Sequence, residues 1–120
     1  MNIRLSENSI RIRLSVADAR ILQGTGELRC VLATPGSGLS LRARLRPGGA
    51  FSLEETAEGG SSWGLIVPEQ EFAELCLAAK REGVKRSELE RSFSSNTGER
   101  SIEVQIEIDQ FDVRQELRSK

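Results

Sequence analysis

Arginine recurs at alternate positions in two short stretches of the chain. Arg11 and Arg13 lie in SIRIRLS, and Arg42, Arg44 and Arg46 lie in LSLRARLR. Alternate residues of a β-strand project to the same side, so each stretch would place its guanidinium groups in a row with a spacing of roughly 7 Å. A guanidinium binds phosphate or carboxylate groups through two parallel hydrogen bonds. Both rows are therefore candidates for binding an anion.

A row of carboxylates occupies the stretch IEVQIEID near the end of the chain, where Glu103, Glu107 and Asp109 share one strand face. Acids that hold a divalent cation beside bases that hold phosphates are the ingredients of a triphosphate tunnel. Such tunnels resemble closed barrels whose first strand begins E-x-E-x-K, which the stretch Asn2-Ile3-Arg4-Leu5 does not match. We therefore expect Glu103 and Glu107 to pair with arginines across neighbouring strands.

The residue types present restrict the chemistry further. The chain has no histidine and no tyrosine, and its two cysteines are Cys30 and Cys76. The absence of histidine removes the commonest general base near neutral pH, the Ser/His and Cys/His pairs and nearly all zinc sites. Both cysteines lie on the apolar side of their predicted elements, so we expect buried, reduced thiols. We predict no catalytic residue, metal site or cofactor.

The charge of the 120 residues is nearly balanced but unevenly distributed, with a formal net charge of −1. Residues 1–50 contain eight arginines and three acids, whereas residues 51–120 contain nine bases and fifteen acids. A near-neutral total argues against nucleic-acid binding driven by a large positive field. Apolar runs fall far short of the roughly 20 residues that cross a bilayer, and we find no apolar signal segment, so we expect a cytoplasmic protein without membrane contact.

Apolar residues alternate along most of the chain, which predicts strands. A helical period is found over 16–23, where Ser15 and Asp18 form a weak capping box, and again after Pro68 up to Gly83. The expected strands cover 3–5, 10–14, 28–32, 39–45, 51–53, 63–67 and 102–108.

These elements predict an α+β fold, a mainly antiparallel sheet of about six to eight strands with two helices packed on one face. We expect one domain over 1–111 and a polar tail over 112–120, which frays or forms a loose helix. The segment 84–93 fits neither period cleanly and is interpreted as a strand. No internal repeat of fixed period is visible.

A glycine-rich stretch, Gly59–Ser62, precedes Trp63, the only tryptophan. It lacks the glycine and lysine spacing of a phosphate-binding P-loop, so we predict a hairpin loop. Trp63 is predicted to lie in the core, with a partly exposed interface anchor as the alternative.

The beginning of the chain resembles a family of small, uncharacterised bacterial proteins. In that family an M-K-I-R-like strand leads to N-S-I-R-x-R-L and a short helix, and the chain has MNIRL followed by NSIRIRLS. The family is also similar in ending its domain on an apolar strand followed by an acid and a phenylalanine, here Asp109 and Phe111. Asn2 and Gln110 stand where the family tends to have lysine. The resemblance implies a compact cytoplasmic domain and assigns no site.

Two hypotheses about function follow from these observations. The preferred one is a noncatalytic domain that binds a partner protein, or a second copy of itself as a homodimer, through a sheet edge or the arginine face. The alternative is a binder or hydrolase of a phosphate ligand, a nucleotide or polyphosphate, that uses the arginine rows together with Glu103 and Glu107.

Overall fold

The structure is a computed structural model that describes residues 1–34, 37–55, 62–97 and 100–118. Within these ranges, the side chains of 31–34, 37–39, 55, 97 and 100 are not described. Most of the predicted glycine-rich loop, residues 59–61, lies outside the described residues.

The described chain forms an α+β arrangement of eight strands and three α-helices, and one short 3-10 helix labelled η2 lies between α2 and β7. The bounds are β1 (Asn2–Ser6), β2 (Ser9–Leu14), α1 (Val16–Thr25), β3 (Glu27–Thr34), β4 (Ser37–Arg46), β5 (Ser52–Glu55), β6 (Ser62–Pro68), α2 (Glu69–Ala78), η2 (Arg86–Leu89), β7 (Glu90–Thr97), β8 (Arg100–Ile108) and α3 (Gln110–Arg118).

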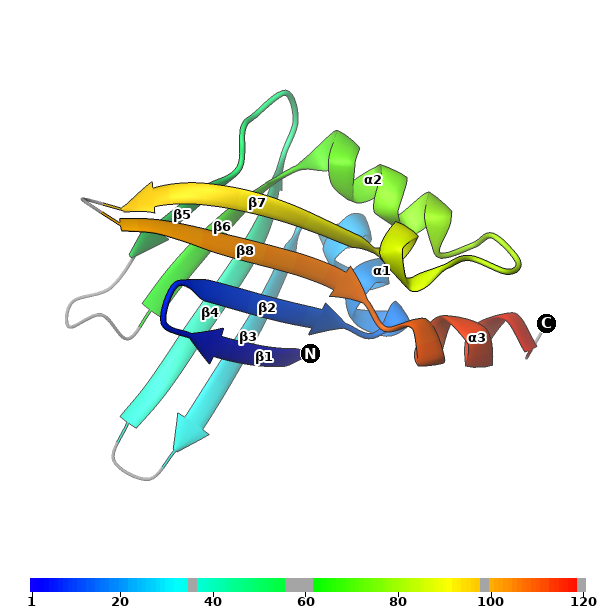
Figure 1. The fold of residues 1–120 in the computed structure, drawn as a ribbon, viewed down its shortest axis with the longest axis horizontal. Coiled ribbons are helices and arrows are strands. Elements are labelled where there is room, and N and C mark those ends of the chain that lie inside the picture. Colours follow the sequence, from blue (N-terminus) through cyan, green and yellow to red (C-terminus); the bar gives the residue numbers. More distant parts are fainter. Residues whose placement is uncertain (35–36, 56–61, 98–99, 119–120) are drawn as a thin grey trace.

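The strands form two mixed sheets of four, which corrects the expectation of a single sheet; most of the strand pairs are antiparallel, as expected. We call the sheet with the order β1-β2-β8-β7 sheet A, and the sheet with the order β3-β4-β6-β5 sheet B. Each consists of two antiparallel hairpins whose central strands, β2 with β8 and β4 with β6, run parallel. The two sheets cross face to face, with α1 and α2 at one end (Figure 1). The helices therefore do not simply cover one face of one sheet.

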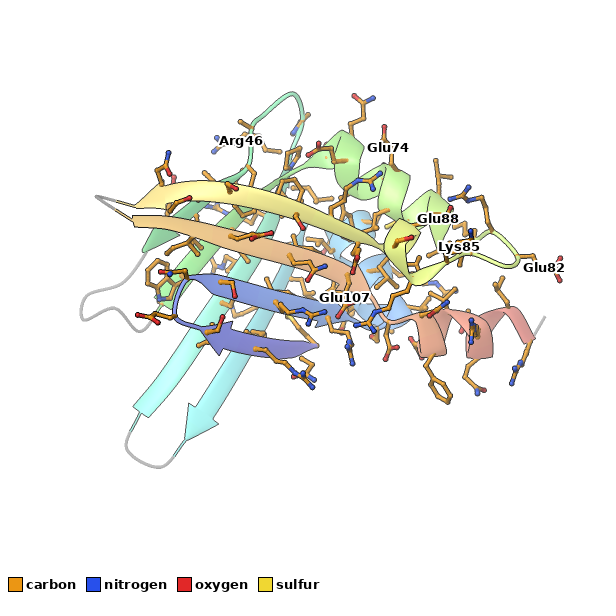
Figure 2. All side chains as sticks on the ribbon, in the orientation of Figure 1. Arg46, Glu74, Glu82, Lys85, Glu88 and Glu107 are labelled. Carbon is orange, nitrogen blue, oxygen red and sulfur yellow. The ribbon has the colours of Figure 1, made fainter. Side chains whose placement is uncertain are left out.

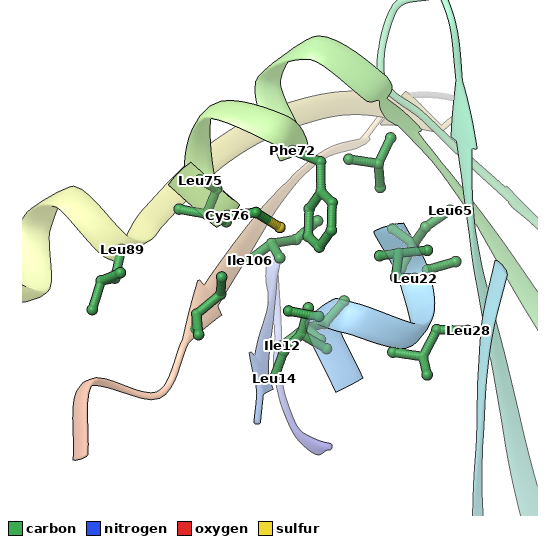
Figure 3. Packing of buried hydrophobic residues seen from close by; sticks show 14 of the residues in the cluster. Ile12, Leu14, Leu22, Leu28, Leu65, Phe72, Leu75, Cys76, Leu89 and Ile106 are labelled. Carbon is green, nitrogen blue, oxygen red and sulfur yellow. The ribbon is translucent and has the colours of Figure 1, made fainter. Parts of the chain in front are cut away.

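The core lies between the two sheets and under the two helices. Figure 3 shows Leu22 of α1 together with Phe72 and Leu75 of α2 facing the strand residues Ile12 and Leu65. Apolar residues at alternate strand positions face inward from both sheets, as their period predicts. Cys76 is buried, as expected, and burial raises the pKa of its thiol although the charge of Lys80 opposes this shift. Cys30 and Trp63, which were both expected to be buried, are only partly buried.

The ends of α1 follow local sequence signals. The Ser15 hydroxyl accepts a hydrogen bond from the N–H of Asp18, and the Asp18 carboxylate accepts one from the N–H of Ser15, so the expected capping box is present. Gly26 ends the helix at φ +79°, a left-handed conformation that glycine adopts without steric cost.

The chain after α2 differs from the prediction. The helix ends at Ala78, before Gly83, and the chain then turns into η2. The expected strand over 84–93 begins only at Glu90, because Val84 and Leu89 are buried on either side of a helical turn rather than at strand spacing.

Part of the expected polar tail forms α3. Its Val113 is 1% exposed, and Asp112 accepts a hydrogen bond from the N–H of Val16 at 2.6 Å, which ties α3 to the start of α1. No helix within the described ranges is long and apolar enough to span a membrane.

An internal two-fold relation, not visible as a sequence repeat, connects the two halves of the chain. The N-terminal half contains β1, β2, α1, β3 and β4, and the C-terminal half contains β5, β6, α2, β7 and β8. In chain order, β1 corresponds to β5, β2 to β6, α1 to α2, β3 to β7 and β4 to β8. When each strand of sheet A is replaced by its counterpart, the strand order of sheet A becomes that of sheet B. The two helices have ten residues each, and β3 and β7 have eight each.

The correspondence extends to single residues. Leu22 and Leu75 are both the seventh residue of their helix, and both are 1% exposed. On the outer faces, the first residues of β3 and β7 are Glu27 and Glu90, which bind the sixth residues of β4 and β8: Arg42 Nε lies 2.9 Å from Glu27, and Gln105 Nε2 donates to Glu90 at 2.8 Å. The halves thus share a side-chain arrangement as well as a topology.

We expect equivalent core positions to contribute equally to stability. Leu22→Ala and Leu75→Ala should each lower the free energy of unfolding by about 2–5 kcal/mol, because each leaves a cavity under a helix. Leu77→Ala is the matched control, since this side chain is 63% exposed and its loss should change stability by no more than about 0.5 kcal/mol. Urea unfolding measures all three. A loss at Leu77 as large as that at Leu75 would contradict the burial described.

Asp18 should make stability depend on acid pH. Burial disfavours its carboxylate, but hydrogen bonds from the Met1 amino group and from Ser15 outweigh this effect and lower the pKa of Asp18 below its ordinary value of 3.8. Its contribution is therefore complete above pH 3.8 and lost as the pH falls below it. Asp18→Asn should cost about 1 kcal/mol at pH 7. Urea unfolding between pH 7 and pH 2 should show the wild type and the variant converging below pH 3.8; a constant difference would refute this role.

Candidate anion-binding face of sheet B

The predicted arginine rows lie on different sheets. Arg11 and Arg13 project from the outer face of β2 in sheet A, because Ile12 and Leu14 between and after them are buried in the core. Arg42 and Arg44 project from the outer face of β4 in sheet B in the same way. The two rows therefore form two separate surfaces.

The row in sheet A is paired with a carboxylate of the chain itself. The parallel pairing of β2 with β8 places Glu107 beside Arg13, whose Nε donates to Glu107 Oε1 at 3.0 Å. Arg11 lies 3.8 Å from the same oxygen, and Arg86 lies 3.7 Å from the other. Figure 2 labels Glu107 on β8 beside β2. Glu107 is only 4% exposed, and its hydrogen bond and charge raise the pKa of Arg13. The expected pairing of these arginines with Glu107 is thus present.

The other two predicted acids do not join Glu107. Glu103 is exposed four positions earlier on β8, a separation of about 13 Å along a strand. Asp109 follows the end of β8 and accepts a hydrogen bond from the N–H of Phe111 at the start of α3. In the described part of the chain, no three Asp, Glu, Cys or His side chains are grouped so that they could hold a metal ion. The three predicted carboxylates do not form a shared cation site.

The row in sheet B is only partly paired. Arg42 binds Glu27 at 2.9 Å, and Arg29 lies 4.0 Å from the same carboxylate. Arg44 makes no ion pair or hydrogen bond through its side chain with any other described residue. Arg29 and Arg42 therefore share the Glu27 carboxylate, and Glu54 of β5 lies beside Gly64 on the same face. All of these charged groups are at least partly exposed.

These arginines surround a hollow of about 360 Å³ in the outer face of sheet B, and the described residues that line it include no acid. The hollow exists because small residues occupy the centre of the sheet: register places Ser40 beside Ser62 and Arg42 beside Gly64. Its lining consists of Arg29, Ser40, Arg42, Arg44, Ser62 and Gly64.

The sequence predicted only part of this site. Arg42 and Arg44 belong to the expected row, but Arg46 does not reach the hollow, since its side chain packs over Gly49 in the turn after β4 (Figure 2). Arg29 and the two serines were missed because only strand register brings them together. Gly64 carried a usable signal, since a glycine inside a strand often marks a place where another group approaches the backbone closely.

The two-fold relation shows why the faces differ. Arg44 in sheet B occupies the position that Glu107 occupies in sheet A, each being the eighth residue of its strand. Gly64 likewise replaces Arg11, each being the third residue of its strand. A position that carries a carboxylate in sheet A thus carries an arginine in sheet B, and a position that carries an arginine in sheet A is a glycine at the open hollow of sheet B.

Comparison with protein-family models, curated proteins and solved structures gives no match for the chain. The resemblance of its first hairpin to small bacterial proteins remains a prediction.

Removing the charge of Glu107 should destabilise the fold. Glu107→Gln should lower the free energy of unfolding by about 1–3 kcal/mol, because charge-assisted hydrogen bonds are lost at a buried position while the arginines remain partly solvated. Glu103→Gln on the same strand face is the matched control and should have an effect within about 0.5 kcal/mol. Equal urea midpoints for the two variants would argue against Glu107 as the centre of this cluster.

Proposed function

We propose that the chain is a noncatalytic binding module that holds acidic side chains of a partner protein on the outer face of sheet B. The observation that carries the proposal is Arg44, a guanidinium without a partner among the described residues, at the edge of a hollow lined by two further arginines. In this function, planar and permanently charged guanidinium groups bind carboxylates, and no residue has to change its protonation state.

The geometry favours an extended acidic segment. Arg42 and Arg44 are alternate residues of one strand, so their spacing of roughly 7 Å equals that of alternate side chains in an extended peptide. Exposed ion pairs contribute only about 0.2–1 kcal/mol each, so a single carboxylate would bind weakly. A segment with acids at alternate positions can contact both arginines at once, while Ser40 can donate a hydrogen bond from the floor of the hollow.

The hollow also supports a second candidate, a phosphate ligand, because the same guanidinium and hydroxyl donors bind phosphate. A hydrolytic role has less support, since Glu103, Glu107 and Asp109 neither converge nor lie on this face. We therefore favour the acidic peptide and make phosphate binding an outcome of the test.

Binding of a fluorescent peptide with glutamate at alternate positions should depend on Arg42 and Arg44. Fluorescence anisotropy at low salt should give a Kd at least ten times higher for the double variant Arg42→Gln/Arg44→Gln than for the wild type, and binding should weaken as salt is added. The matched control is Arg114→Gln/Arg118→Gln, which removes the same charge from exposed positions of α3 and should leave the Kd within twofold.

An equal loss in both double variants would mean that only net charge matters, and it would overturn the proposed site. The phosphate-ligand function is tested with inorganic phosphate and tripolyphosphate, each with and without magnesium. If tripolyphosphate raises the melting temperature of the wild type but not of the Arg42/Arg44 variant, and the peptide does not bind, the phosphate-ligand function replaces the one proposed.

A further inference from the structure

A second concavity lies between the two sheets, at the end away from α1 and α2. Figure 1 shows the β1–β2 turn at the opposite end of sheet A from the helices. The pocket has a volume of about 210 Å³. Its apolar lining comes from both sheets and consists of Ile3, Ile10, Leu41, Trp63 and Ile102.

The pocket has a polar and open mouth. Ser6, Glu7 and Ser9 of the β1–β2 hairpin line it together with Leu5, whose side chain is 59% exposed. Among the described residues of the lining, Glu7 is the one charged side chain, and none of the arginines of the two outer faces belongs to it. The hydroxyl groups of Ser6 and Ser9 are hydrogen-bonded to each other.

We propose that this pocket binds the aliphatic chain of a small uncharged amphiphile, with its polar head at the Ser6–Ser9 turn. An apolar cavity of about 150 Å³ in another protein stays dry and accepts benzene, so a pocket of about 210 Å³ has room for a short alkyl chain. Branched aliphatic side chains and an indole supply the contacts, and the serines supply hydrogen bonds to a hydroxyl head. Glu7 disfavours an anionic head by like-charge repulsion.

The site is separate from the hollow proposed to bind acidic groups. Trp63 lies between Ser62 and Gly64 in β6, and neighbouring residues of a strand point to opposite faces of the sheet. Leu41 separates Ser40 from Arg42 in β4 in the same way. One ligand cannot occupy both sites, because the backbone of sheet B lies between them.

The single tryptophan provides a built-in reporter. We would titrate the wild-type chain with 1-butanol, 1-hexanol, 1-octanol and 1-decanol and follow the fluorescence of Trp63. Each pair of added methylenes should tighten binding about tenfold while the chain is being buried. The gain should stop at about eight carbons, when the pocket is full. Octanoate at neutral pH should bind at least ten times more weakly than octanol.

Variants at the wall and mouth test the location. Ile102→Glu places a charge in a partly exposed wall and should weaken octanol binding at least tenfold. Glu7→Gln changes an exposed residue, so it should fold normally, raise the affinity for octanoate severalfold and leave that for octanol unchanged. Leu77→Glu on α2 is the matched control for an exposed apolar residue and should change neither.

Affinity that keeps rising beyond decanol, or that falls equally in the Leu77 and Ile102 variants, would show adsorption to apolar surface and overturn the proposal. So would the absence of any change in Trp63 fluorescence with octanol. If the Ile102 variant fails to fold, the response to Glu7→Gln decides the question. Peptide binding by Arg42 and Arg44 is measured separately, so failure of one proposal does not imply failure of the other.

Discussion

The fold depends on two parallel strand pairs, β2 with β8 and β4 with β6. Each pair joins a hairpin of the N-terminal half to a hairpin of the C-terminal half, so neither half can complete a sheet alone. Parallel neighbours cannot be linked by a tight turn, and their pairing requires that distant segments meet. In β2 and β8 the partners Ile12 and Ile106 are both core residues, so burial and register are fixed together. Because each sheet contains one hairpin from each half of the chain, the two halves share one continuous core between the sheets.

The two-fold arrangement of hairpins also explains how one fold presents two different outer surfaces. Equivalent inward positions stayed apolar, as with Leu22 and Leu75, because both contribute to one shared core. Equivalent outward positions can differ in charge, since Glu107 in sheet A corresponds to Arg44 in sheet B, whereas Glu27 and Glu90 keep the same charge. An outward residue is constrained only by its neighbours on that face. Glu107 stabilises sheet A by pairing with its arginines, whereas Arg44 at the corresponding position in sheet B has no ion pair with another described residue.

Strand and helix positions could be predicted from local pattern, but the sheets could not. The alternation from Ile102 to Ile108 and the cap at Ser15 are confirmed, because both depend on residues close in sequence. Alternation shows which side of a strand is buried and not which strand lies beside it, so the parallel pairs were missed. The two-fold relation was also invisible, because the halves share apolar spacing while most side chains differ. For the candidate site, Arg42 and Arg44 were predicted, whereas Gly64 and Ser62 became part of it only through the register of β4 and β6.

The central strands of sheet B connect the two proposed sites physically. Along β6 the residues Ser62, Trp63 and Gly64 face alternately outward, inward and outward, so three consecutive residues serve a polar hollow on one face and an apolar pocket on the other. The side chains of each face suit their surroundings: the charged groups on the outer face remain hydrated, and the indole on the inner face is partly buried. Ser62 and Gly64 open the hollow because their side chains are small, whereas Trp63 between them faces the interior because neighbouring strand residues point to opposite faces. Two concavities on opposite faces of one strand pair thus follow from the strand period of two, with two small residues outward and one large residue inward at this segment of β6.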